Sequence, residues 1–253
     1  MVDAADLKSA DRKIVGVRVP PTAPLDFLVM DAPLKSLKLW LDPIPRSGPE
    51  NMAVDEWLLE TVQEAVLRVY GWRGNWGSMG RFCRVQEAQE SISSVCWVRR
   101  STGGGIVDHQ RDWTYSLVIP ATENLAKVQA GESYRVIHEK LSRILSDRYQ
   151  LVSKAEVCRE IGGVCFEKPV LSDVVDEHGY KIAGAGQRRT KEGLLHQGSV
   201  AGQCVDIVSS DRSKRLCDVL ANVWMEAEYH PPDHLIRQKI RDRYGSEEWT
   251  KRR

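Results

Sequence analysis

The chain has 253 residues, of which 42% are hydrophobic and 28% are charged. This length and composition suit one large globular domain or two small ones and exclude a fibrous or wholly disordered chain. The 36 Lys and Arg residues nearly cancel the 35 Asp and Glu residues, which gives a formal net charge of +1. The chain therefore lacks the strong positive charge that favours binding to nucleic acid or to a membrane surface.

The cysteines and the amino-terminal residues bear on location. The 6 cysteines do not show the paired spacing of a disulfide framework. Residues 1–13 mix acidic and basic side chains without an apolar segment, and no uncharged apolar run reaches the roughly 18 residues of a membrane span. We expect reduced thiols, a cytoplasmic location, no membrane span and no metal site.

The spacing of apolar residues predicts the following elements in chain order. Strand-like alternation at residues 37–41 precedes helical spacing at 52–66. Strands are predicted at 66–72, 78–82, 95–99 and 113–119, and a helix at 132–149. Further strands are predicted at 170–175, 181–188 and 194–201, and further helices at 211–225 and from Asp233 to about Gly245.

The order of these elements indicates the fold class. Predicted strands outnumber helices and are joined more often by tight turns than by helices, which is typical of an α+β fold. We expect a mixed, mainly antiparallel sheet flanked by helices. Residues 1–36 contain Pro20, Pro21, Pro24 and Pro33 and little periodicity, so they predict a poorly structured extension before one domain at 37–253.

A glycine-rich segment separates two of the predicted strands. It reads Arg99-Arg100-Ser101-Thr102-Gly103-Gly104-Gly105-Ile106-Val107-Asp108-His109. Three consecutive glycines allow a ligand to approach the backbone closely and let amides face an anion. The segment lacks the Gly-Lys-Ser/Thr of a nucleotide phosphate loop and is not followed by a helix. By itself it is more typical of a flexible hairpin with solvated arginines.

Two further segments contain candidate reactive groups. The predicted strand Lys181-Ile182-Ala183-Gly184-Ala185-Gly186-Gln187-Arg188 is rich in small residues, which leaves a groove where a linear ligand can lie. The segment Cys165-Phe166-Glu167-Lys168-Pro169 follows two glycines, which could present its thiol at a site. Taken singly, Lys181 is more typical of a solvated strand end and Cys165 of an inert buried thiol.

In combination, these segments resemble a known family, the lipoate-protein ligases and octanoyltransferases of the biotin-protein ligase superfamily. The resemblance begins at Asn51-Met52-Ala53-Val54-Asp55-Glu56 and includes the glycine-rich segment ending at His109. It continues through Tyr115-Ser116, the strand from Lys181 and the turn His196-Gln197-Gly198-Ser199. It covers the chain from about Leu37 to the end and implies a catalytic core like that of class II synthetases and biotin-protein ligases.

The resemblance also implies the roles of individual residues. The cysteine-dependent octanoyltransferases carry their nucleophile in a Cys-Phe-Asp-x-Pro segment, which Cys165 matches with Glu167 in place of Asp. Cys165 and Lys181 are therefore the expected catalytic residues. The expected substrate-binding residues are Arg100, Gly103, Gly104, Gly105, Ile106, Val107, His109, Gln187, His196 and Gly198.

A charged lysine near the thiol would activate it. An ammonium within about 4 Å of the Cys165 sulfur would lower the thiol pKa by up to about three units, into the range of reactive cysteines. The thiolate would then attack an acyl thioester.

Three functions remain open at this point. The favoured one is transfer of an octanoyl or lipoyl group from acyl carrier protein to a lysine of a lipoyl domain or a glycine-cleavage H protein, without a cofactor. The first alternative is an ATP-dependent and Mg-dependent lipoate-protein ligase that acts through lipoyl-adenylate. Asp108, beside the glycine-rich segment, would repel phosphate and so disfavours the ligase. The second alternative is a non-catalytic binder of acylated carrier domains.

Overall fold

The computed structural model describes residues 32–153, 169–202 and 210–252. Its strands are β1 (Leu34–Leu41), β2 (Ala65–Tyr70), β3 (Trp76–Met79), β4 (Cys96–Arg99), β5 (Ile106–Asp108), β6 (Asp112–Pro120), β7 (Gln150–Leu151), β8 (Val174–Val175), β9 (Lys181–Arg189), β10 (Gly193–Ala201) and β11 (Ala221–Glu226). Its helices are α1 (Gly48–Thr61), α2 (Val85–Ser91), α3 (Asn124–Lys127), α4 (Ala130–Leu145), α5 (Ser210–Leu220), α6 (Asp233–Lys239), the π-helix η1 (Ile240–Tyr244) and α7 (Glu247–Thr250).

The strands form two sheets. The larger has eight strands in the order β11-β1-β2-β6-β10-β9-β8-β7. β1 runs parallel to β11 and β2, and the neighbours from β2 to β7 are antiparallel. The smaller sheet has the order β4-β3-β5. The predicted α+β class with a mixed, mainly antiparallel sheet is therefore confirmed.

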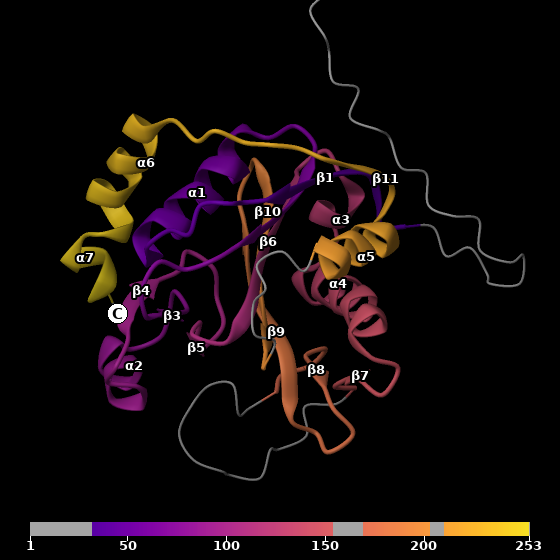
Figure 1. Ribbon diagram of the computed structural model, residues 1–253, viewed down its shortest axis with the longest axis horizontal. Coiled ribbons are helices and arrows are strands. Elements are labelled where there is room, and N and C mark those ends of the chain that lie inside the picture. Colours follow the sequence, from indigo (N-terminus) through magenta and orange to yellow (C-terminus); the bar gives the residue numbers. More distant parts are fainter. Residues whose placement is uncertain (1–31, 154–168, 203–209, 253) are drawn as a thin grey trace, which may run out of the picture.

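Helices cover both faces of the large sheet (Figure 1). Successive side chains of a strand point to opposite faces, and this alternation divides the core in two. Leu39 of β1 packs in the cluster that includes residues of α4 and α5, whereas the adjacent Trp40 packs in the cluster that includes residues of α1 and α6. The small sheet lies between α1 and α2 in the view of Figure 1, and residues 100–105 of the glycine-rich segment connect its strands β4 and β5.

The helix predicted at 211–225 is wrong in its last third. α5 ends at Leu220, and Ala221 begins β11, which pairs in parallel with β1 through Leu34. Local periodicity could not reveal this strand, because its hydrogen-bond partner lies far away in the sequence. β1 itself begins at Leu34, before the predicted domain boundary at residue 37, and residues 1–31 lie outside the described part of the chain.

Other element boundaries also differ from the predictions. α1 begins at Gly48 rather than residue 52, because the Ser47 amide donates to the Glu50 carboxylate at 2.7 Å and Pro49 fits the first turn. The polar helix α2 was not predicted; only its Ala88 is buried. The strand predicted at 170–175 is reduced to Val174–Val175.

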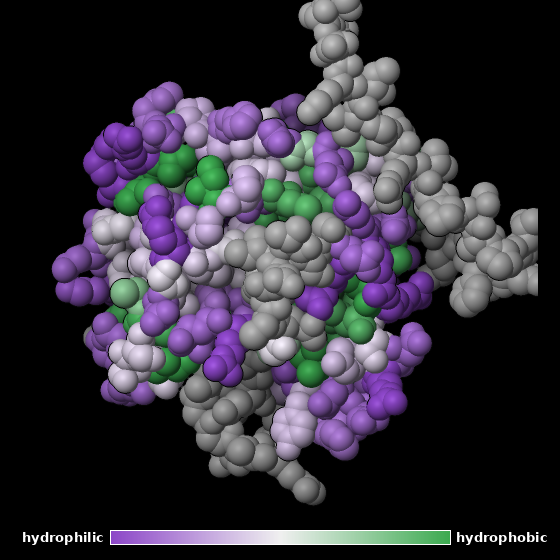
Figure 2. Space-filling model, viewed as in Figure 1, coloured by the Kyte–Doolittle hydropathy of each residue, from purple (hydrophilic) through white to green (hydrophobic). Residues whose placement is uncertain are grey.

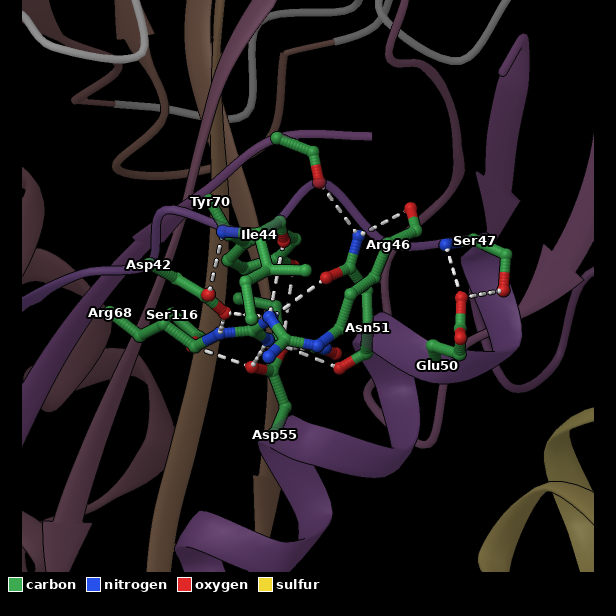
Figure 3. Close-up of polar contacts among 12 residues, drawn as sticks. Asp42, Ile44, Arg46, Ser47, Glu50, Asn51, Asp55, Arg68, Tyr70 and Ser116 are labelled. Atoms are coloured by element: carbon green, nitrogen blue, oxygen red, sulfur yellow. Dashed lines mark hydrogen bonds and ion pairs between the residues drawn. The ribbon is translucent and has the colours of Figure 1, made fainter. Parts of the chain in front are cut away.

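A buried arginine joins α1 to the large sheet (Figure 3). Arg68 of β2 has no exposed surface and donates hydrogen bonds to Asp42 at 2.8 Å, to Asp55 at 2.6 Å and to the Asn51 side chain at 2.7 Å. We call these four residues the Arg68 cluster. Two buried carboxylates thus face one guanidinium, and the arginine fixes the position of α1 over the sheet.

The outer surface shown in Figure 2 is mainly hydrophilic, with hydrophobic residues in separate patches. Over the described residues, no helix is both long enough and apolar enough to cross a membrane.

Replacing Arg68 with Met should lower the free energy of unfolding by about 3–5 kcal/mol, because Asp55 would remain buried without a counter-ion and Asp42 would keep only its ion pair with Arg46. Urea denaturation followed by circular dichroism measures this change. Arg135→Met is the matched control, because Arg135 is half exposed in its ion pairs and its loss should cost less than about 1 kcal/mol. Equal losses for the two variants would contradict this account of the Arg68 cluster.

Candidate active site

A cavity of about 700 Å³, including the space at its open mouth, lies between the two sheets. One wall comes from the small sheet and the glycine-rich segment, and the facing wall from β9 and β10. The remaining lining residues come from α1, from the end of β2 and the residues after it, from β6 and from the segment before β8. The full lining is Met52, Tyr70, Trp72, Ser78, Arg100, Gly104, Gly105, Ile106, Val107, His109, Thr114, Val170, Lys181, Gly184, Ala185, Gly186, Gln197, Gly198 and Ser199.

Residues 102–105, which we call the glycine loop, pass between two other glycines. A Cβ on Gly80 would lie 1.9 Å from the Gly104 carbonyl oxygen, and a Cβ on Gly186 would lie 2.3 Å from the Gly103 carbonyl oxygen. No side chain fits at either position without displacing the backbone. Gly104 itself has φ +87°, a conformation that favours glycine. The loop is therefore packed against β9 rather than solvated as a flexible hairpin.

Hydrogen bonds fix the glycine loop from two sides. The Thr102 hydroxyl donates to the Gln197 side chain at 2.7 Å, and the Gln197 amide donates to Asp55 of the Arg68 cluster at 2.7 Å. The Gly103 amide donates to the Gln187 carbonyl, with a donor-acceptor distance of 3.3 Å. That amide is therefore engaged within the protein, which leaves the amides of Gly104 and Gly105 for the expected substrate-binding role of the loop.

The Lys181 side chain lies along its own strand, beside Gly184, and so reaches the cavity. A Cβ on Gly184 would lie 2.5 Å from the lysine Nζ, so the glycine makes room for the side chain. The ammonium forms an ion pair of 2.8 Å with Asp173, which is fully buried. Asp173 also accepts hydrogen bonds from the Val170 amide at 2.8 Å and from the Tyr134 hydroxyl at 2.5 Å. Burial and the Asp173 carboxylate raise the pKa of Tyr134, which keeps this hydroxyl a donor.

The ion pair changes the expected electrostatics of the thiol. A pKa decrease of about three units assumes an unpaired ammonium, and the Asp173 carboxylate offsets part of its field. The decrease that Lys181 can cause is therefore smaller than the sequence-based value. Cys165 lies outside the described residues, which resume at Pro169, close in sequence to the cavity-lining Val170.

Most of the residues expected to bind substrate line this cavity, and three do not. Arg100, Gly104, Gly105, Ile106, Val107, His109 and Gly198 line it together with Lys181. Gly103 is packed against Gly186, and neither Gln187 nor His196 is part of the lining.

His196 and Gln187 lie on the opposite face of the sheet, against α4. The Gln187 amide donates to His196 Nδ1 at 3.1 Å, and the Tyr115 hydroxyl lies 3.3 Å from the other ring nitrogen. Burial, with smaller contributions from His138 and Arg189, lowers the pKa of His196 well below its ordinary value, so the ring is neutral. This placement differs from the expected substrate-binding role of both residues. His196 faces away from the cavity because adjacent residues of β10 face opposite sides.

Gln197 is one of several cavity-lining residues that are not among those expected from the sequence. It faces the cavity because it neighbours His196, whose side chain takes the other face. Leu194 and Leu195 pack in different core clusters, and Gln197, two residues beyond Leu195, lies on the same face as Leu195. The sequence does not show which leucine faces which cluster, because both are apolar.

Asp108 does not belong to the cavity wall. Its carboxylate accepts hydrogen bonds from the amide and side chain of Gln110, at 3.0 and 3.3 Å. Asp108 therefore does not place a negative charge in the cavity wall, and the expected repulsion of a phosphate by Asp108 does not count against the ligase. Within the described ranges, no group of three or more His, Cys, Asp or Glu side chains could hold a metal ion.

The comparisons with known proteins identify the family. The model of the lipoyl protein ligase A/B catalytic domain matches residues 47–219, which is well over half of the chain. This protein therefore belongs to that family. A curated relative, "Octanoyltransferase LipM" from Staphylococcus aureus, is 35% identical over 62% of this chain. The chain spans about 62% of the length of that relative.

Solved structures share the fold. A lipoate protein ligase from T. acidophilum with bound lipoic acid has a TM-score of 0.62 and 19% sequence identity, covering 88% of this chain and 99% of that one. A lipoate-protein ligase A bound with ATP has a TM-score of 0.61 and 18% identity, with the same coverage of 88% and 99%. The expected architecture of the family is thus present.

The close contact between the glycine loop and β9 generates a stability prediction. Gly186→Ala should lower the free energy of unfolding by about 1–3 kcal/mol, because the new methyl group overlaps the Gly103 carbonyl. Denaturant titration measures the change. Gly131→Ala in α4 is the matched control, since a Cβ there meets nothing within 4 Å; a similar loss in the control would contradict the packing argument.

The buried His138 generates a pH prediction. Burial lowers its pKa from 6.5 to about 4, while Nδ1 donates to the Ser172 carbonyl at 2.8 Å. Between these pH values the unfolded chain binds a proton that the folded chain does not, so the stability falls as the pH drops from about 6.5 to about 4. His138→Gln should remove about 2 kcal/mol of the loss between pH 7 and 4.5. Denaturation series at several pH values measure this slope, and the exposed His178→Gln should leave it unchanged.

Proposed function

We propose that this protein transfers an octanoyl or lipoyl group to a specific lysine of a lipoyl carrier domain, through a thioester on Cys165. The observation that carries the proposal is the position of Lys181, whose ammonium is held at the cavity wall by the buried Asp173. The likeness to relatives named octanoyltransferases supports the same chemistry.

The cavity suits a linear acyl chain. Apart from Lys181, β9 contributes small residues to the wall, at Gly184, Ala185 and Gly186, while Met52 and Ile106 supply apolar surface. Burying seven methylenes at about 0.8 kcal/mol each contributes roughly 5–6 kcal/mol, which is enough to select acyl length. This contribution does not distinguish a thioester from a free acid, so the polar groups at the mouth must select the reaction.

The proposed reaction has two acyl-transfer steps. The Cys165 thiolate attacks the thioester of the donor, the carrier thiolate leaves, and the acyl group remains on the sulfur. The acceptor lysine amine then attacks the new thioester and forms the amide. The Cys165 sulfur leaves and takes up the proton that the amine loses, which regenerates the thiol. Lys181 stabilises the negative charge on sulfur and on the carbonyl oxygen, with the Gly104 and Gly105 amides as further donors.

The proposed partners follow from this chemistry. The donor is an octanoylated acyl carrier protein, and the acceptor is a lipoyl domain or a glycine-cleavage H protein. No cofactor is required, because the thioester already supplies an activated acyl group. We place the reaction in the cytoplasm, where the carrier proteins would be available.

An ATP-dependent lipoate-protein ligase is the alternative function. A specific observation favours it: the fold matches that of a ligase solved with ATP, and the Asp108 carboxylate is turned to Gln110 rather than to the cavity. This reaction would require ATP and Mg and would not use Cys165. Binding of acylated carrier domains without turnover is a further alternative.

The test is a transfer assay with the full chain, octanoyl carrier protein and a lipoyl domain, without ATP. We expect acylation of the lipoyl domain, detected by mass spectrometry. Cys165→Ser should lower the rate by at least about a thousandfold, because the serine hydroxyl is a far weaker nucleophile at neutral pH.

Two further variants serve as controls in this assay. Cys96→Ser removes another thiol, which is exposed at β4, and should keep the wild-type rate. Lys181→Ala should impair either chemistry and so tests the site rather than the mechanism. Full activity of Cys165→Ser with free octanoate and ATP, together with no transfer from the thioester donor by the wild-type protein, would establish the ligase instead.

A further inference from the structure

A continuous line of hydrogen bonds runs beside the cavity from β10 to the glycine loop. We propose that Asp112 is a positioning residue which acts through His109 and Ser78 to hold Arg100, and through Arg100 the glycine loop, in the shape that receives the acyl head group. The catalytic part of this inference rests on the proposed function, and the structural part does not.

Asp112 is the fixed end of this line. It is buried, with 3% of its surface exposed, at the start of β6. Its Oδ2 accepts hydrogen bonds from Ser199 of β10 at 2.5 Å and from His109 Nδ1 at 2.7 Å, and its Oδ1 accepts one from Thr114 at 3.0 Å. A buried carboxylate with donors from three places cannot rotate without losing several of them.

The position of the proton on His109 follows from its two neighbours. The carboxylate of Asp112 only accepts, so Nδ1 carries the hydrogen. The other ring nitrogen, Nε2, lies 2.6 Å from the Ser78 oxygen. In the neutral ring Nε2 then accepts the Ser78 hydroxyl hydrogen, and the Ser78 lone pairs remain for Arg100, which donates from Nη1 at 2.6 Å. Trp72 stacks on the imidazole at 4.1 Å and holds the ring plane.

The order Ser78, His109, Asp112 has the connectivity of a serine nucleophile with its base, but Ser78 is placed differently. Its side chain has no exposed surface, and its oxygen already faces the Arg100 guanidinium. The hydroxyl therefore serves to orient Arg100 rather than to attack an acyl group.

Arg100 transmits this orientation to the glycine loop. Its Nη2 donates to the carbonyl oxygens of Gly103 at 3.1 Å and Gly105 at 3.0 Å. Because the C=O and the following N–H of one peptide point in opposite directions, fixing the Gly103 carbonyl also fixes the direction of the Gly104 amide. The Gly105 carbonyl also accepts from the Gly80 amide at 3.0 Å, which makes that amide a reporter of the loop position.

Asp112→Asn tests the proposal, because asparagine has nearly the same shape as aspartate but is uncharged and has one acceptor oxygen instead of two. In the wild-type protein, ¹⁵N NMR of His109 should show hydrogen on Nδ1, and the variant should show a shift toward Nε2. Hydrogen exchange of the Gly80 amide should accelerate by at least about tenfold, since the Gly105 carbonyl loses its fixed position. The transfer rate should fall by a similar factor.

Ser78→Ala is the second variant, which keeps Asp112 and its other bonds. It should accelerate Gly80 exchange while His109 keeps its hydrogen on Nδ1. Asp147→Asn, an exposed site, is the matched control and should change neither measurement.

Hydrogen on Nε2 in the wild-type protein, or unchanged Gly80 exchange in both variants, would overturn the proposal. Unchanged transfer with accelerated exchange would overturn only its catalytic part. Loss of transfer in the Asp147 control would show a defect outside this line of residues and would also count against it. Absence of transfer in the wild-type protein, with the NMR and exchange results as expected, would instead contradict the proposed function.

Discussion

The burial of Arg68 together with Asp55 is the constraint from which the arrangement of the site follows. Both groups are buried, and loss of Arg68 would leave the Asp55 carboxylate without a counter-ion, whereas Arg68 is also paired with Asp42. Asp55 also accepts from Ser116 of β6 at 2.8 Å and from Gln197 of β10 at 2.7 Å. One carboxylate on α1 thus connects three strands, and through Gln197 it reaches Thr102 at the start of the glycine loop.

The glycine loop is held before any substrate arrives. Thr102 is tied to the large sheet, Arg100 holds the loop carbonyls from the small sheet, and Gly186 allows β9 to touch the loop backbone. Donors placed in advance do not have to reorganise when charge develops on a reacting carbonyl. Lys181 is prepared in the same way, because Asp173 fixes its ammonium at the cost of part of its field. In the proposed reaction, this arrangement would favour precise placement of the ammonium over a maximal electrostatic effect on the Cys165 thiol.

Much of this fold was predictable from local sequence patterns. The face of the sheet to which several site residues point was not. The strands around residues 113–119 and 181–201 have clear apolar or small-residue patterns, and the glycine-rich segment marks the cavity correctly. The strand Ala221–Glu226 depends on pairing with β1, and a local pattern carries no information on a distant partner. His196 and Gln197 differ by one position, yet one packs on α4 and the other lines the cavity. Only the register of β10 decides between them.

The proposed thioester on Cys165 is tested most directly by identifying which residue of this protein becomes acylated. The full chain would be mixed with octanoyl carrier protein alone, quenched in acid, digested and mapped by mass spectrometry. We expect one octanoyl group on the peptide that contains Cys165. Hydroxylamine at neutral pH should remove this group, because it is held as a thioester. An unmodified Cys165, with acyl transfer that appears only when ATP and free acid are supplied, would contradict it.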